Sequence, residues 1–425
     1  MHVKTRETCR VCGSSKLIPI LSLGDQFVTN FVDEPNSDYP RGPLELVLCN
    51  VKGSGCGLLQ LKHTMERDVL YRKYWYKSGI STTMVKAIAD IVSSAERLVH
   101  LSPGDIVVDI GSNDGTLLKQ YKTVGVVTVG FEPSNLHALG IAGTSKIIND
   151  YFNHKAFEKE FGAKKAKVIT SIAMFYDLED PNTFVEDMKK CLHEDGLWII
   201  QMNYLGLMLE NNTFDNISHE HLEYYSLLSL EYLLKKHDME AFDVELNDVN
   251  GGSFRIYVRH KEGKIQGFAG AEERLRKQRD VEKKMGLNNS KAYEAFAKRI
   301  ELVKNDVTSF LKQEIKKGKK IFIYGASTRG LVVLQYFGIG KQLITAATDM
   351  NSDKWGKYIV GAGIPIMSVE EYRKQKPDYL FVLPYHFLEE IQQQERDFLK
   401  NGGKMIVALP QFRVISKNAC LRARK

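Results

Sequence analysis

Short apolar runs alternate with amphipathic segments through the middle of the chain. Four runs rich in β-branched residues, IVVDI, VVTVGFE, AKVITSIAM and GLWIIQM, predict buried strands. The stretches between them, such as NTFVEDMKKCLHEDG, are predicted to be helical. Alternation of strand and helix is typical of a parallel sheet with helices on both faces. The segment FDVELNDVNGGSFRIYVRH predicts a closing antiparallel hairpin, with Asn250 and Gly251 near its turn.

The flanking regions follow different patterns. The N-terminal part alternates short strands with turns, and STTMVKAIADIVSSAERLV predicts a helix over residues 81–99. Residues 268–318 are charged and helical, and we interpret them as connecting helices with one apolar stripe: Phe296, Ile300, Val303, Val307 and Phe310. A second strand–turn–helix unit, IFIY–GASTRG–LVVLQYF, comes next, and later strands are predicted in LITAATD, DYLFVLP and KMIVALP. The patterns divide the chain into three parts: residues 1–72, 73–267 and 268–425.

Charge and hydropathy exclude some partners. The 425 residues carry a formal net charge of +7, spread over helical stretches such as KQEIKKGKK, so nucleic acid is not an expected partner. The N-terminus MHVKTRETCR has no apolar core, and no apolar run is long enough to span a bilayer. We therefore expect a cytoplasmic protein that binds no membrane and is a monomer or a weak homo-oligomer.

Four of the six cysteines cluster near the N-terminus. Cys9 and Cys12 form a Cys-x-x-Cys knuckle, and Cys49 and Cys56 follow after 36 intervening residues. In a reducing compartment, clustered cysteines indicate a metal site before a disulfide set. Zinc accepts four thiolates as a closed tetrahedral site, so we predict a structural Zn²⁺, with four reduced thiols as the alternative. The two isolated cysteines are Cys191 and Cys420.

The turn after the first buried strand is acidic. In IVVDIGSNDG, Asp109 and Asp114 flank the glycine turn, and Glu132 ends the next strand, where it can bind ribose hydroxyls. Carboxylates here would repel a pyrophosphate, and the spacing from Gly111 to Gly115 differs from that of dinucleotide sites. The turn suits a cationic cofactor without phosphate, S-adenosylmethionine (SAM). We also predict a helix in TLLKQY, directly after the turn. The alternative is a strand–turn–helix that holds no ligand.

The second glycine turn has the opposite character. Between Gly325 and Gly330 it carries Ser327, Thr328 and Arg329 and no acid. Backbone N–H groups at a helix N-terminus, two hydroxyls and a guanidinium form an anion site that suits a diphosphate. Together the two turns indicate methyl transfer to a molecule that carries a nucleoside diphosphate. The alternative for the second turn is an ordinary strand–helix connection with a solvated arginine.

The segment FDNISHEHLEYYS, residues 214–226, is dense in titratable groups. Methylation of a carbon requires a base that removes a proton beside a carbonyl and a hydrogen-bond donor for the resulting enolate. A histidine suits the first role, and a tyrosine or a protonated acid suits the second. The spacing of His219, Glu220 and His221 excludes the zinc-protease pattern, although a His-x-His metal pair or a polar helix cap with core tyrosines remains an alternative.

The segment KYWYKSGIS, residues 73–81, precedes the predicted cofactor sheet. Tyr74 and Tyr76 lie on one side of it if it is extended. These tyrosines either line the substrate site or pack the junction between two parts of the chain.

In this order, the pieces resemble the zinc-containing, SAM-dependent C-methyltransferases of deoxysugar biosynthesis, which methylate a nucleotide-linked 4-keto sugar, typically at C-3. The resemblance covers nearly the whole chain and depends on CRVCGS, CGLLQL, DIGSNDGTLL, HEHLEYYS, IYGASTRG and TDMNSDKWGKYIVGAGIPI. It implies an α/β protein with an N-terminal zinc-binding domain, a central Rossmann-like class I methyltransferase domain and a second, C-terminal Rossmann-like domain.

The resemblance also implies roles for individual residues. His221 would be the base that removes the C-3 proton, Glu220 would orient it or contact the keto oxygen, and Tyr76 would border the sugar. The residues expected to bind SAM are Asp109, Gly111, Asn113, Gly115, Glu132, Asn149 and Asp150. The residues expected to bind the nucleotide sugar are Tyr224, Asn250, Tyr324, Ser327 and Arg329.

Two departures from the family pattern concern the reaction itself. Relatives often carry a tyrosine three residues before the catalytic histidine, where this chain has Ser218. The loop after the fourth strand usually bears a histidine, whereas SIAMFYDLED places Tyr176 and Asp177 there. The open alternatives are methylation of oxygen or nitrogen on a nucleotide sugar, a non-catalytic nucleotide-sugar-binding protein, and an NAD-dependent oxidoreductase.

Overall fold

The computed structural model describes residues 3–35 and 38–416, so Cys420 lies outside the described residues. A seven-stranded sheet forms the middle of the molecule, in the order β13-β14-β11-β10-β7-β8-β9. Its five parallel strands are β7 (Ile106–Ile110), β8 (Val127–Phe131), β9 (Lys146–Ile148), β10 (Ala166–Ile172) and β11 (Leu192–Asn203). The predicted closing hairpin is confirmed as antiparallel β13 (Met239–Asn247) and β14 (Ser253–His260), joined through Val249–Gly251.

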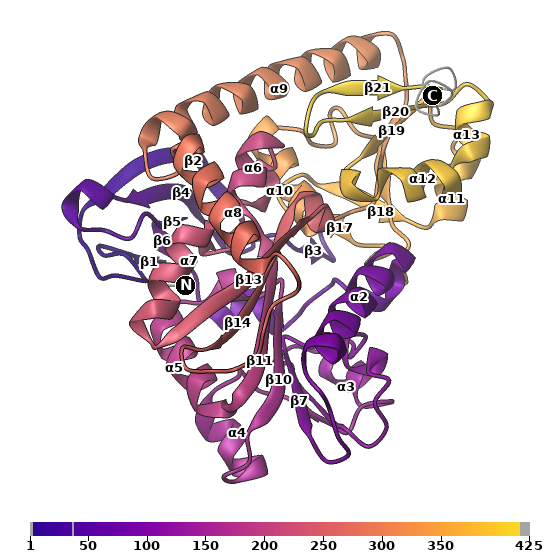
Figure 1. Cartoon of the computed structure of the whole chain (residues 1–425). Coiled ribbons are helices and arrows are strands. Elements are labelled where there is room, and N and C mark those ends of the chain that lie inside the picture. The colour runs from indigo at the N-terminus through magenta and orange to yellow at the C-terminus, as the bar shows by residue number, and fades with distance from the viewer. Residues whose placement is uncertain (1–2, 36–37, 417–425) are drawn as a thin grey trace.

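Helices cover this sheet on both faces, as the strand–helix alternation predicts (Figure 1). The main covering helices are α2 (Thr82–Leu98), α4 (His154–Phe161), α5 (Pro181–Cys191) and α7 (Leu227–Lys236). Shorter helices are α1 (Arg67–Tyr71), α3 (His137–Gly140) and α6 (Leu205–Glu210).

One predicted helix is wrong. The segment TLLKQY forms only a short 3-10 turn, Leu118–Gln120. Helix α2 already occupies this part of the sheet, because Ile88 and Ile91 pack in the same apolar cluster as Leu117. The apolar residues of this segment are therefore buried against α2, a helix that precedes β7 in the chain.

The N-terminal region shares its sheets with both of its neighbours. Its four-stranded sheet runs β12-β5-β4-β2, and β12 (Glu223–Tyr224) comes from the titratable segment far along the chain. At the other side, β3 (Phe31–Val32) pairs with β17 (Tyr358–Ile359) at the edge of the C-terminal sheet. The remaining strands of this region are β1 (Lys4–Thr5), β2 (Leu17–Phe27), β4 (Arg41–Cys49), β5 (Leu59–Leu61) and β6 (His63–Thr64).

The C-terminal part contains a mixed sheet in the order β21-β20-β19-β15-β16-β18-β17-β3. Four of its parallel strands match the predicted runs: β15 (Ile321–Tyr324), β16 (Ala346–Thr348), β19 (Tyr379–Val382) and β20 (Lys404–Val407). With β3 and β17, the strands β18 (Ile364–Met367) and β21 (Arg413–Ile415) complete the sheet. Its helices are α10 (Thr328–Phe337), α11 (Val369–Lys374), α12 (Leu388–Gln394) and α13 (Arg396–Lys400).

The charged segment before this sheet forms α8 (Ala271–Met285) and α9 (Ser290–Lys316), as predicted. Helix α9 lies along the C-terminal sheet in Figure 1. Its stripe is buried at Phe296, Ile300, Val303 and Val307, whereas Phe310 is only partly buried and Leu311 completes the stripe.

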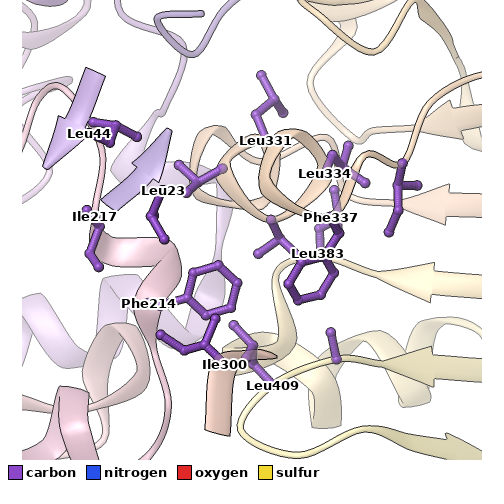
Figure 2. Close-up of a cluster of buried hydrophobic side chains, with 14 of the residues drawn as sticks. Leu23, Leu44, Phe214, Ile217, Ile300, Leu331, Leu334, Phe337, Leu383 and Leu409 are labelled. Carbon is purple, nitrogen blue, oxygen red and sulfur yellow. The ribbon is translucent and has the colours of Figure 1, made fainter. Parts of the chain in front are cut away.

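One apolar cluster joins the three parts of the chain. Figure 2 shows Leu23 and Leu44 of the N-terminal sheet facing Phe214 and Ile217, with Ile300 of α9 and the C-terminal residues on the far side. The C-terminal members are Leu331, Leu334, Phe337, Leu383 and Leu409. This packing holds residues 214–217, the start of the titratable segment, between the two sheets.

Candidate active site and zinc centre

A cavity opens at the carboxyl ends of β7, β10 and β11. This is the edge at which α/β sheets bind ligands. Five residues predicted from the sequence line it: Tyr76, Asp109, Gly111, Asn113 and Asn250. The structure therefore places the acidic turn at this cavity.

Asp109 supplies a buried carboxyl to this cavity. The hydroxyl of Thr170 donates to Asp109 Oδ1 over 2.6 Å, and burial raises the pKa of the carboxyl to about 7. Removal from water disfavours the charged form unless a positive charge arrives. A sulfonium or ammonium group in the cavity would favour ionisation of Asp109, so the donor chemistry fits SAM.

Glu132 organises the glycine turn. Its Oε2 accepts the Asn113 N–H over 2.7 Å, and its Oε1 accepts the Ser134 N–H over 2.9 Å. Gly111 has φ +72°, and Asn113 has φ +53°, so the turn bends through the left-handed region twice. The carboxylate thus holds the strained backbone beside the cavity.

Four of the seven predicted cofactor residues, Gly115, Glu132, Asn149 and Asp150, are not among those that line the cavity. A Cβ on Gly115 would lie 2.9 Å from Gly140 Cα, so this glycine permits close backbone packing. Asn149 Nδ2 donates to the Glu132 carbonyl, and the carboxylate of Asp150 accepts the Tyr151 N–H. Their roles toward SAM stay predictions.

Residues 73–81 form a strap over the cofactor turn. Asn113 Nδ2 donates to the Tyr76 carbonyl over 2.9 Å, and the Gly79 N–H donates to Asp114 Oδ2 over 2.8 Å. Lys77 reaches Asp353 of the C-terminal part over 2.6 Å. The side chain of Tyr76 lines the cavity and is 39% exposed.

A second, smaller cavity lies beside the first. Asn203 of β11 lines it and donates from Nδ2 to the carbonyl of Asn250, which lines the first cavity. The polar side chains around the second cavity come from several elements: Tyr176, Asn203, Tyr204, Asn216, His221, Glu223 and Tyr224. The predicted base and the predicted cofactor turn therefore share one end of the sheet.

His221 is held as a neutral imidazole. Its Nδ1 lies 2.7 Å from the Asn216 carbonyl, and a carbonyl can only accept, so Nδ1 carries the proton. Within the described residues, Nε2 has no hydrogen-bond partner. Burial lowers the pKa of His221 to about 4, with the nearby Arg329 charge adding to the effect. An unprotonated Nε2 is the form that a general base requires.

The other groups of the segment take different places. Burial raises the pKa of Glu220 to about 7, and Glu220 is not among the residues lining the second cavity. His219 Nε2 lies 2.9 Å from the Gly42 carbonyl, which anchors the segment to the N-terminal sheet. Tyr224 lines the cavity and donates to the Asn216 carbonyl over 3.4 Å. Ser218 is buried, and its hydroxyl has no partner.

The four N-terminal cysteines converge. Their sulfurs all lie within 4.8 Å of one another, with Cys9 and Cys56 separated by 3.5 Å and Cys12 and Cys49 by 3.4 Å. A tetrahedral zinc about 2.3 Å from each thiolate requires sulfurs about 3.8 Å apart, so the set fits Zn²⁺. Cys9, Cys49 and Cys56 pack in the apolar cluster of the central sheet. The metal would join the N-terminal chain to the central sheet.

The second glycine turn differs from its prediction in one respect. Arg329 Nη2 lies 2.8 Å from Asp215, and Nη1 donates to the Asn250 carbonyl over 2.6 Å. Ser327 caps α10 by accepting the Gly330 N–H, and Tyr324 donates from its hydroxyl to Gln394. The guanidinium is therefore not the free or solvated cation that the sequence indicated.

Models of known protein families match the chain in three segments. A model described as "Putative zinc binding domain" matches residues 9–71, a methyltransferase domain matches residues 84–243, and a C-methyltransferase C-terminal domain matches residues 248–410. The C-methyltransferase NovU of Streptomyces niveus is 30% identical over 428 residues, which covers 99% of this chain and 99% of NovU. The chain belongs to the C-methyltransferase family.

Solved structures overlap this C-methyltransferase over part of its length. The plantazolicin methyltransferase BpumL in complex with SAH is 15% identical, with a TM-score of 0.32 over 41% of this chain and 83% of its own. Magnesium protoporphyrin IX methyltransferase of Synechocystis is 10% identical, with a TM-score of 0.31 over 44% and 82%.

The family membership makes SAM the cofactor and the four cysteines the zinc-binding set of this C-methyltransferase. No helix within residues 3–35 and 38–416 is long and apolar enough to cross a membrane.

Sequence reasoning missed the apolar wall of the cofactor cavity. Met84 and Ile88 line the cavity from α2, and Leu117 lines it from the turn region. The helical spacing of Met84 and Ile88 can be seen in the sequence. Their position over the first glycine turn depends on the strap, residues 73–81, that precedes α2. Gln201 and Ser253, from adjacent antiparallel strands, were also missed.

Proposed function

We propose that this C-methyltransferase methylates a 4-keto deoxysugar carried on a nucleoside diphosphate, at C-3. The observation that supports the proposal is the neutral His221, whose unprotonated Nε2 belongs to a cavity beside the SAM cavity. A carbon next to a ketone is acidic enough for a histidine to deprotonate when the enolate oxygen is stabilised. Transfer to oxygen or nitrogen would need no enolate.

His221 takes the proton from C-3 at Nε2 while Nδ1 keeps its hydrogen bond to the Asn216 carbonyl. The resulting positive charge on the imidazole is costly in a buried site, and the enolate beside it offsets that cost. Bound SAM supplies the electrophilic methyl group. The remaining contribution of the protein is to hold the two reactants in line and exclude water.

The nucleoside diphosphate is proposed to lie toward the second glycine turn. The N-terminus of α10 retains backbone N–H groups suited to an anion, and Tyr324, Ser327 and Arg329 stay its predicted ligands. Since Arg329 is paired with Asp215, a diphosphate would share this guanidinium with the carboxylate. Asn250 and Tyr224 would lie between the sugar and the cofactor.

The test uses the purified zinc-loaded protein, methyl-labelled SAM and a panel of 4-keto deoxyhexoses on thymidine or uridine diphosphate. Mass spectrometry should find one added methyl group, and NMR should place it on carbon. A product methylated on oxygen or nitrogen, or tight binding of every sugar with no product, would refute the proposal.

Replacement of the base gives the sharpest variant. His221→Asn keeps a polar side chain but removes the basic nitrogen, and turnover should fall roughly 10²–10⁴-fold. The dissociation constant of SAM should stay within about twofold, because His221 does not line the SAM cavity. His100→Asn, at an exposed position, is the control and should match the wild type. Substantial turnover by His221→Asn would favour methylation of a heteroatom.

A further inference from the structure

The chemistry of the second cavity requires a donor that the proposed base does not supply. When His221 removes the C-3 proton, negative charge develops on the keto oxygen, and a hydrogen-bond donor must face that oxygen. Ser218, which occupies the position of the family tyrosine, is buried and does not line the cavity. Glu220 does not line it either. The donor must therefore come from another residue of the cavity wall.

Three tyrosines line the second cavity: Tyr176, Tyr204 and Tyr224. The hydroxyl of Tyr204 accepts a hydrogen bond from Gln278 Nε2 over 2.6 Å, and that of Tyr224 donates to the Asn216 carbonyl. The hydroxyl of Tyr176 makes no hydrogen bond with any residue that the structure describes. Of the three, only Tyr176 has a hydroxyl without a hydrogen-bond partner among the residues that the structure describes.

Tyr176 is also fixed against the base. Its ring centroid lies 4.4 Å from that of His221 at an interplanar angle of 60°, and its carbonyl accepts the Leu222 N–H over 2.8 Å. The side chain is 6% exposed. Backbone and ring thus place the phenol at a set distance from the imidazole, in a site that excludes most water.

The electrostatic surroundings keep the phenol protonated. Burial and the neighbouring carboxyls of Asp177 and Glu220 raise the pKa of Tyr176 well above its ordinary value, against an opposing effect of Arg329. A protonated phenol is a donor at all pH values at which the enzyme would work. Asp177 has a buried carboxyl oxygen without a partner, and burial also raises its pKa.

We propose that Tyr176 is a second catalytic residue, whose hydroxyl donates a hydrogen bond to the C-4 keto oxygen while His221 removes the C-3 proton. This inference rests on the proposed function. The C–H electron pair becomes the carbon–carbon double bond of the enolate, and the carbonyl π pair moves to oxygen, where the Tyr176 hydrogen bond stabilises it. The phenol keeps its proton throughout.

The second half of the reaction restores the ketone. The enolate carbon forms a bond to the methyl group of SAM while the methyl–sulfur bond breaks and leaves its electron pair on sulfur. The proton stays on His221 until product release and then passes to water. No oxidant or further reactant is needed.

The experiment separates proton abstraction from methyl transfer. The protein is incubated in D₂O with SAH and thymidine-diphospho-4-keto-6-deoxyglucose, and NMR follows deuterium entering at C-3. Wild type should exchange this proton, and Tyr176→Phe should exchange it roughly 10²-fold more slowly, as expected when one donor to an oxyanion is lost. Tyr176→His, which keeps a ring with an N–H donor, should recover part of the rate.

The control is Tyr293→Phe, which removes a buried tyrosine hydroxyl outside the cavity, and its exchange rate should match the wild type. The thermal midpoint and SAH affinity of Tyr176→Phe should stay at wild-type values, because the ring remains. Exchange by Tyr176→Phe within about twofold of wild type would overturn the inference and leave the proposed function intact. A slower exchange accompanied by loss of SAH affinity would also overturn it, since the hydroxyl would then act on structure. No exchange and no methylation of any keto sugar by wild type would instead refute the proposed function.

Discussion

The two glycine turns have similar local structure but different surroundings. Each follows a central strand of a parallel sheet, β7 or β15, and each has a glycine with positive φ directly after the strand, +72° at Gly111 and +81° at Gly325. The first turn borders a cavity that Asp109 lines. The charged group of the second turn, Arg329, is paired with Asp215 from the 3-10 turn Phe214–Asn216.

This difference shows what a turn sequence can and cannot reveal. The residue types show which charge each turn carries: the first turn is acidic and the second is basic. Whether that charge remains available depends on residues that reach it from elsewhere, and Asp215 is 114 positions away from Arg329. The charge of the first turn remains available to a ligand. The charge of the second turn is largely used in an ion pair that joins two parts of the chain.

The largest expected effect comes from removing the carboxylate at the second turn. Asp215→Ala leaves the buried Arg329 unpaired, and this should lower the free energy of unfolding by about 3–5 kcal/mol in chemical denaturation. The control Glu273→Ala removes the partner of Arg276 in a pair whose side chains are 75% and 74% exposed, and it should cost less than about 1 kcal/mol. Equal losses in both variants would show that the second turn is as open as the surface.

Replacing one glycine of each turn by alanine should separate effects on stability from effects on SAM binding. Gly325→Ala places a Cβ 2.5 Å from Pro384 Cγ, whereas Gly111→Ala places one 3.3 Å from Met174 Cγ. Both carry about 1–2 kcal/mol of left-handed strain, and the overlap with Pro384 adds about 1–3 kcal/mol to Gly325→Ala. Denaturation should therefore show the larger loss for Gly325→Ala, while calorimetry should show weakened SAM binding for Gly111→Ala.

The matched control for these glycines is Gly338→Ala. Gly338 has φ +66° and nothing within 4 Å of an added Cβ, so it reports the strain alone. Unchanged SAM affinity in Gly111→Ala would argue against the cavity as the cofactor site.

The charge of the first turn should appear as a pH-dependent affinity. Asp109→Asn removes a charged contact worth about 1.5–3 kcal/mol, so SAM should bind about tenfold more weakly or worse. The pKa of Asp109 is raised to about 7, so the free protein holds the neutral acid below that pH and the carboxylate above it. A cation prefers the carboxylate, and the affinity of wild type relative to Asp109→Asn should rise from pH 6 to pH 8. Calorimetric titrations that show a constant ratio would exclude this role.

The smallest effect concerns the cap of the second turn. Ser327→Ala loses the hydrogen bond to the Gly330 N–H and should cost about 1 kcal/mol of stability. Ser368→Ala, which removes the comparable cap of α11, should cost a similar amount. If Ser327 also binds the diphosphate, only Ser327→Ala will raise the KM for the nucleotide sugar. Equal KM values in the two variants would limit Ser327 to capping.

Much of the architecture followed from local pattern. The parallel strands, the closing hairpin near Asn250, the paired helices α8 and α9 and the second strand–turn–helix unit all form where the apolar periodicity predicts them. The helix expected in TLLKQY does not form, because α2 covers the sheet at that place and packs against Leu117. Apolar periodicity predicts that a segment buries one side, but it does not predict which element that side packs against.

The sequence by itself determined the chemistry that is available: four thiols for zinc, an acidic turn that suits a cationic cofactor, and a segment with two histidines, for which we propose proton abstraction. Residue type alone sets these capacities, since ligand preference and charge belong to the side chain. Tertiary structure decided which groups stay free to act. It joined β12 to the N-terminal sheet, paired Arg329 with Asp215 and kept His221 neutral by burial. It also left the Tyr176 hydroxyl without a hydrogen bond to any residue within 3–35 and 38–416. Burial and pairing arise between residues far apart in the chain, so no local stretch of sequence contains them.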